Sequence, residues 1–150
     1  MRYIAAVLAT TSVLAGCAVA GTPTMAPVTN EWRQAVMEAV AGLGSKMGPI
    51  GNAMVTADRK TDYGALHSAC NDMRLYLDSV QNKVLPGPDI KVNTALQAGF
   101  DGYRSMADQC VGLTPANSSG RLMKLGATID EAHLHIKDAL RLLGVAIPKR

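Results

Sequence analysis

Apolar residues recur at alternating spacings of three and four along most of this chain, from residue 32 to residue 143. An α-helix turns once every 3.6 residues, so this spacing places the apolar residues on one face of each helix. No run of alternating β-branched residues predicts a strand. The four predicted faces consist of Trp32, Val36, Ala39, Leu43, Met47, Ile50 and Met54; Leu66, Cys70, Met73, Leu77, Val80 and Val84; Val92, Leu96, Gly99, Tyr103, Met106, Cys110 and Leu113; and Leu122, Leu125, Ile129, Ala132, Ile136, Leu140 and Leu143.

Short segments separate the four predicted helices, at residues 58–61, 86–88 and 114–116. Links this short make consecutive helices antiparallel neighbours. The sequence therefore predicts an all-α domain over residues 29–150, folded as an antiparallel up-down-up-down four-helix bundle. Gly144 and Pro148 should end the fourth helix. The residues that can cap the first three helices are Thr29 or Asn30, Thr61 or Asp62, and Asp89 or Asn93.

The first predicted helix contains residues that weaken helices, namely Gly42, Gly44, Gly48 and Pro49. A proline inside a helix costs about 3 kcal/mol and a glycine about 1 kcal/mol. We therefore expect a kink or a break near Gly48–Pro49, although the apolar face stays in phase across it.

The first sixteen residues have a different character. One basic side chain, Arg2, precedes an uncharged and mainly apolar run from Ile4 to Ala15. This run is shorter than the roughly 20 residues that a membrane-spanning helix needs. Together with small residues before a cleavage point, it is typical of a secretory signal peptide. Residues 17–28 contain Gly21, two threonines and two prolines and predict a flexible linker ahead of the bundle.

The leader ends in Leu14-Ala15-Gly16-Cys17. This tetrapeptide resembles the lipobox of bacterial prolipoproteins, and the resemblance covers the leader alone. It implies a signal peptide over residues 1–16, cleavage between Gly16 and Cys17, and a diacylglyceryl group with palmitate-type fatty chains on the Cys17 thiol. Because two such chains hold a protein stably to a bilayer, the implied location is the extracytoplasmic face of a cell membrane. The alternative is an ordinary secretory leader in which Cys17 is incidental.

Three cysteines are present, Cys17, Cys70 and Cys110. If Cys17 is acylated, the other two remain, and an exported protein favours a disulfide between them. The alternative, a metal or redox pair, lacks a CxxC spacing. Both residues lie on core faces of consecutive antiparallel helices, and their midpoint is residue 90, slightly beyond the predicted turn. We therefore expect the third helix to start late, near Asn93, or to be irregular at residues 90–92.

Composition narrows the classes of partner and activity. The formal net charge of the 150-residue chain is only +3 and aromatic residues make up 4% of it. Nucleic-acid-binding proteins have basic clusters or aromatic stacking surfaces, and this sequence has neither, so no nucleic-acid partner is expected. The sequence also lacks a GxSxG elbow, a Walker loop, a dinucleotide fingerprint and a haem attachment motif. We expect neither catalytic residues nor a cofactor.

A few side chains invite a ligand-binding interpretation. Glu131 and His135, or His135 and Asp138, have spacings that can share a ligand, but His133 and His135 face different sides of a helix. Thioethers suit Cu(I), yet most methionines lie on core faces and are expected to pack there. Gly99 and Gly102 allow close helix packing or leave room for a small ligand. The methionines concerned are Met25, Met37, Met47, Met54, Met73, Met106 and Met123.

Two aromatic side chains have a further possible role. Trp32 is expected in the core, with contact to lipid or a partner as the alternative. His67 is a weaker candidate for a ligand or partner contact.

The sequence therefore predicts a non-enzymatic lipoprotein of the cell envelope that binds another envelope protein through a helix face. One alternative is a carrier or sensor of a small ligand or metal in the bundle interior, with a cavity formed by Gly99, Tyr103 and Met106. Another is an exclusion lipoprotein encoded by a phage or plasmid.

Overall fold

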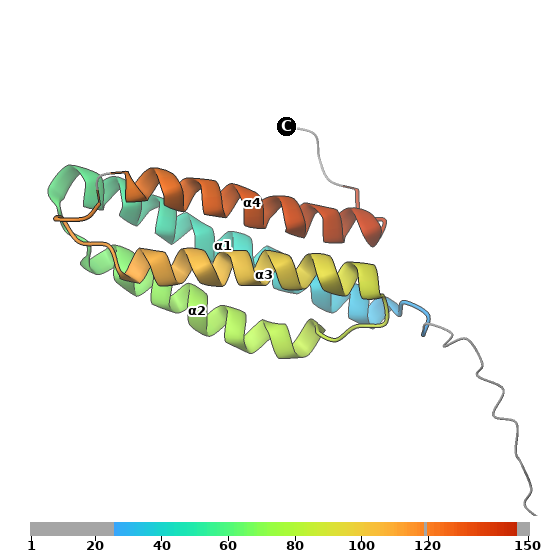
Figure 1. The fold of residues 1–150 in the computed structure, drawn as a ribbon. Coiled ribbons are helices and arrows are strands. Elements are labelled where there is room, and N and C mark those ends of the chain that lie inside the picture. Colours follow the sequence, from blue (N-terminus) through green and yellow to red (C-terminus); the bar gives the residue numbers. More distant parts are fainter. Residues whose placement is uncertain (1–25, 119, 147–150) are drawn as a thin grey trace, which may run out of the picture.

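The computed structural model describes residues 26–118 and 120–146. Within these residues the chain forms four α-helices and no strand: α1 (Asn30–Lys60), α2 (Gly64–Val84), α3 (Ile90–Val111) and α4 (Arg121–Leu142). Consecutive helices run in opposite directions and pack as a bundle (Figure 1). The predicted up-down-up-down architecture is confirmed. The predicted signal peptide and residues 17–25 of the predicted linker lie outside the described residues.

Helix α1 begins where the sequence predicted but does not break. The Thr29 hydroxyl accepts a hydrogen bond of 3.1 Å from the Trp32 N–H and so caps the helix. The expected break at Gly48–Pro49 is wrong, because α1 continues through Pro49. The Pro49 ring is exposed, while Leu43 and Ile50 on either side are buried. Packing of both halves on the same core outweighs the local cost of the proline.

The turn between α1 and α2 corrects the predicted cap of α2. Thr61 has a positive φ of 54° and its N–H donates to the Ala57 carbonyl, so it ends α1 rather than starting α2. The residue that precedes α2 is Tyr63, whose side chain makes no capping hydrogen bond. Asp62 instead accepts from the Gly64 N–H at 3.0 Å. Helix α1 therefore extends to Lys60, three residues into the segment predicted as a turn.

Helix α3 does not start late, so the expectation based on the cysteine midpoint is wrong. It begins at Ile90, and the Asp89 carboxylate caps it by accepting from the Lys91 and Val92 N–H groups. The turn between α2 and α3 accounts instead for the difference between the cysteine midpoint and the predicted turn. Leu85 and Asp89 are both extended, and the chain between them continues past the end of α2 before α3 begins (Figure 1).

The connection from α3 to α4 is longer than the predicted three residues and spans residues 112–120. Asn117 organises it, because its side chain accepts from the Thr114 N–H and donates to the Gly112 carbonyl. Gly120, with φ of 76°, precedes α4. At the other end of α4, Gly144 has φ of 71° and stops the helix as predicted.

The core contains most of the predicted apolar faces, and every buried side chain among the described residues is hydrophobic. All residues of the second and third predicted faces are buried. The fourth face is only partly covered, since Leu122, Ile129 and Leu140 are half-buried. Helix α1 packs on α2, α2 on α3 and α3 on α4, whereas α1 and α4 contact each other little. The bundle is therefore least closed between its first and last helices.

Candidate functional site

The predicted site residues fall in two groups. Gly16 and Cys17 lie outside the described residues. Cys70 on α2 and Cys110 on α3 form a disulfide with a Cα–Cα distance of 6.2 Å, and both are fully buried. The predicted pairing is confirmed. Helices α2 and α3 are thus joined covalently within the core.

The end of the bundle that includes the start of α1, the turn between α2 and α3 and the end of α4 is called the anchor-side end below, because the segment predicted to carry the anchor precedes α1. Trp32 lies there, and its indole N–H donates to the Val84 carbonyl at 2.8 Å. The indole ring packs against Gly87 so closely that a Cβ at Gly87 would overlap it. Trp32 thus fastens α1 to the turn after α2, which agrees with the core position expected for it.

The turn between α2 and α3 is held by a second side chain. The Asn93 amide accepts from the Gly87 N–H and donates to the Gly87 carbonyl, each at 2.8 Å. This pair of bonds imitates the pairing of two backbone segments. Together with the indole of Trp32, it fixes Gly87 from two sides.

An open groove of about 680 Å³ runs between α2 and α3 at this end. Its polar side is a hydrogen-bonded chain: Arg104 donates to Gln81, Gln81 to Gln97, and Gln97 to Asp101. These side chains therefore already bind one another across the helix pair. The groove lining consists of Gln81, Asn82, Leu85, Pro86, Ile90, Asn93, Thr94, Gln97, Ala98 and Asp101.

A smaller pocket of about 290 Å³ lies at the opposite end, called the far end below, between the end of α3 and the start of α4. Leu113 and Leu125 are buried beside it, and Arg121 and Lys124 are exposed at its rim. His67 supports this region from α2. Its Nε2 lies 2.7 Å from the Leu113 carbonyl oxygen, and since a carbonyl only accepts, Nε2 bears the proton. His67 therefore has a structural role here.

The interface between α3 and α4 depends on small residues. A Cβ at Gly99 would lie 2.5 Å from the Ile136 Cδ1, and one at Gly102 would lie 2.7 Å from the Ala132 Cβ. Both distances are shorter than any normal contact, so the glycines let α4 approach. Of the two interpretations of Gly99 and Gly102, the structure supports close packing.

Two tyrosines are affected by burial. Desolvation raises the pKa of Tyr103 above its usual value of 10.0, and the negative charge of Asp130 raises it further. Burial also raises the pKa of Tyr76, whose hydroxyl donates to the Ala39 carbonyl at 2.8 Å. Both phenols are therefore held in the neutral form.

The histidines of α4 and the methionines are dispersed. His133 is exposed and His135 half-buried, and no group of three or more potential ligands gathers in the described part of the chain. Met73 and Met106 are fully buried, whereas Met37 and Met123 are 46% and 81% exposed. Met25 lies outside the described residues.

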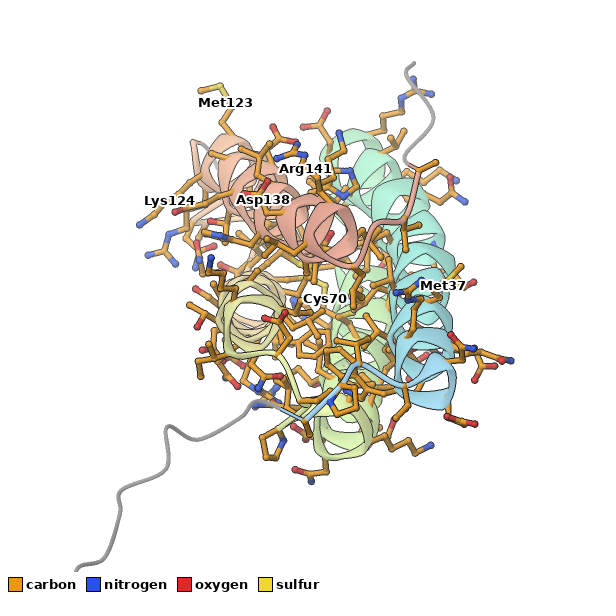
Figure 2. All side chains as sticks on the ribbon, turned by 90° about the vertical axis from the view of Figure 1, so that its right-hand side faces the viewer. Met37, Cys70, Met123, Lys124, Asp138 and Arg141 are labelled. Carbon is orange, nitrogen blue, oxygen red and sulfur yellow. A yellow bond between two sulfur atoms is a disulfide. The ribbon has the colours of Figure 1, made fainter. Side chains whose placement is uncertain are left out.

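Several large apolar side chains point outward. On α4, Met123 and Leu134 are 81% and 60% exposed, and Ala127 is exposed between them. Their spacings of four and seven place them on one face, opposite the core. Figure 2 shows Met123, Lys124, Asp138 and Arg141 on the outside of this helix. The outer face of α4 is thus an amphipathic strip that the fold itself does not use.

No family model, curated protein or solved structure matches this chain. In the described part of the chain, none of the helices is both long and apolar enough to cross a bilayer.

Some of these features were missed at the sequence level. The chain of hydrogen bonds from Arg104 to Asp101 joins two helices, and only the pair Gln97–Asp101, four residues apart, had a local signal. The outer strip of α4 had a clearer signal in the sequence, because Met123, Ala127 and Leu134 repeat with helical spacing outside the predicted core face.

Proposed function

We propose that the protein is a lipoprotein of the cell envelope, acylated at Cys17 and displayed on the outer face of a cytoplasmic membrane. The observation on which this rests is the division of the three cysteines. Cys70 and Cys110 pair in the core, and such disulfides persist in oxidising compartments outside the cytosol. Cys17 is then the one cysteine outside this pair, and it stands in a sequence that resembles a lipobox.

The role we propose is binding of another envelope protein, not catalysis. The outer face of α4 supports this, because Met123, Ala127 and Leu134 expose apolar surface beside charged side chains. Exposed apolar side chains that line up on one helix face are suited to docking against a partner helix or groove. Ala127 is small enough to let such a partner approach closely.

The membrane part of the proposal is tested by the mass and location of the protein. Protein extracted from membranes should lack residues 1–16 and show a diacylglyceryl adduct at Cys17. A Cys17→Ala variant should lose the adduct and leave the membrane fraction. An unmodified Cys17 in a protein found in the cytosol would disprove this part of the proposal.

The partner part is tested by crosslinking in intact cells. A photoreactive residue in place of Ala127 should yield a discrete adduct with one protein of the envelope. The matched control is the same residue in place of Ala41, which is exposed on α1. Equal and diffuse adducts from both positions would show that the face of α4 is not a binding surface.

A further inference from the structure

The anchor-side end exposes apolar side chains that the fold does not require. Ile90 at the start of α3 is 63% exposed and Leu142 at the end of α4 is 50% exposed. Pro86 in the turn before α3 is exposed as well. The start of α3 and the end of α4 lie at the same end of the bundle (Figure 1). Each of these three side chains exposes apolar surface at the same end of the bundle, and together they are called the apolar rim below.

Basic side chains accompany this rim. Lys83 in the last turn of α2 and Lys91 in the first turn of α3 are both exposed, and neither forms an ion pair within the described residues. Two acids of this end are already engaged. Asp89 caps α3, and Asp138 pairs with Arg141 at 2.6 Å. Glu31 in the first turn of α1 is the remaining acid of this end.

The point at which the chain enters the bundle determines which surface the apolar rim can contact. Residues 18–25 separate Cys17 from Ala26, the first described residue, which precedes the start of α1 at the anchor-side end by four residues. Fully extended, nine steps from Cys17 to Ala26 span roughly 30 Å. Helix α1 has 31 residues and is about 46 Å long. The acylated chain would therefore keep this end within roughly 30 Å of the lipid, which is too close for the bundle to stand on its far end.

A short tether to the lipid anchor also lowers the intrinsic lipid affinity that the apolar rim needs to stay in contact with the bilayer. Linking two surfaces through a few residues gives an effective concentration on the order of millimolar. An apolar rim of two or three side chains with two lysines binds lipid only weakly by itself. At that effective concentration, weak binding is sufficient to keep the surface in contact.

We infer that the anchor-side end rests on the headgroup region of an anionic bilayer, with Ile90 and Leu142 in the interface and Lys83 and Lys91 at lipid phosphates. This inference rests on the proposed acylation of Cys17. It adds an orientation: the bundle stands on the membrane, the far end points away from the lipid, and the outer face of α4 lies on the side of the bundle, open to a partner.

The test uses the full acylated protein in vesicles that contain phosphatidylglycerol, with a photoreactive residue at one position at a time. Flotation of the vesicles first reports whether the protein is anchored. Illumination should then attach lipid to the probe in place of Ile90 or Leu142. The matched control is the probe in place of Met123, which is more exposed than either but lies at the far end. We expect a much lower lipid yield there, because about 28 Å of helix α4 separates position 123 from position 142.

The outcomes separate the inference from the proposed function. Protein that floats but gives no lipid adduct at positions 90 and 142 overturns the orientation and leaves the anchor intact. Equal adducts at positions 90, 142 and 123 also overturn it, since the bundle would then lie flat. Protein that does not float and has a free Cys17 thiol overturns both. A second experiment uses the double variant Lys83→Glu with Lys91→Glu. It should lower the yield of lipid adduct in anionic vesicles and leave flotation unchanged. An unchanged yield would show that these lysines do not contact the lipid.

Discussion

The indole N–H of Trp32 and the carbonyl oxygen of Val84 are 2.8 Å apart, although 52 residues separate them in the sequence. This bond joins the first turn of α1 to the last turn of α2. It also places the indole ring on Gly87, so that the turn between α2 and α3 is closed by a residue from the beginning of the domain.

The contact of Trp32 with Gly87 leads to a first prediction. Gly87→Ala should lower the free energy of unfolding by about 1–3 kcal/mol, because the new Cβ overlaps the rigid indole ring. Denaturant unfolding followed by the fluorescence of Trp32 measures this. Gly44→Ala is the matched control, since nothing lies within 4 Å of a Cβ there, and it should raise the stability by up to about 1 kcal/mol. Equal effects of the two changes would contradict the packing described here.

A second prediction concerns the approach of α4 to α3. Gly99→Ala should cost about 1–3 kcal/mol through overlap with Ile136, and Ile136→Ala about 2–5 kcal/mol through the cavity it leaves. The double variant should be more stable than the sum of the two losses predicts, by roughly 0.5–3 kcal/mol, because each change relieves the other. Strictly additive losses of stability would show that Gly99 and Ile136 do not contact each other. Gly126→Ala, with no neighbour within 4 Å, serves as the control.

A third prediction concerns the disulfide. Cys70 and Cys110 are 40 residues apart in sequence, and closing a loop of that length stabilises a fold by about 4 kcal/mol in the chain-entropy model. Adding a reductant should therefore lower the urea midpoint of the natural protein. A variant with both cysteines replaced by alanine should have a low midpoint that the reductant does not change. A natural protein indifferent to reductant would show that the pair contributes nothing.

A fourth prediction follows from the raised pKa of Tyr103. In the folded protein the phenol keeps its proton at a pH where the unfolded chain, with a pKa near 10.0, loses it. The folded state then binds more protons, so stability falls as the pH rises above that value. Unfolding measured from neutral to strongly alkaline pH should show this fall. Tyr103→Phe should make it shallower, and an unchanged slope would exclude Tyr103 as its source.

The sequence predicted the core of α2 and α3 well, because polar residues border the apolar face of each helix on both sides. Phe100, however, is fully buried and lay outside the predicted face, next to Gly99. Ile136 of α4 lies over Gly99. How far such a closely packed helix covers the residues beside a predicted face depends on tertiary packing, and periodicity alone does not show it. The buried Ala53, Ala57 and Ala139 were missed for a related reason, since alanine fits both sides of a helix.

Helix ends were harder to predict than faces. Thr61 looked like a cap for α2, but its positive φ makes it the end of α1. Only the path of the backbone decides which of two adjoining helices such a residue serves. The start of α3 was misplaced because the midpoint of Cys70 and Cys110 assumes a tight turn, whereas the connection comprises residues 85–89 and is extended at Leu85 and Asp89. The tertiary contacts at the candidate site, such as Trp32 with Gly87, had no local signal.

The weak contact between α1 and α4 affects how the domain can be assembled. Every extensive interface joins helices that are consecutive in the chain, so each helix finds its partner as soon as the next segment is present. Topologies made of such local pairings fold rapidly. A polypeptide that emerges with its amino end first can thus build this structure helix by helix in the order in which the helices appear.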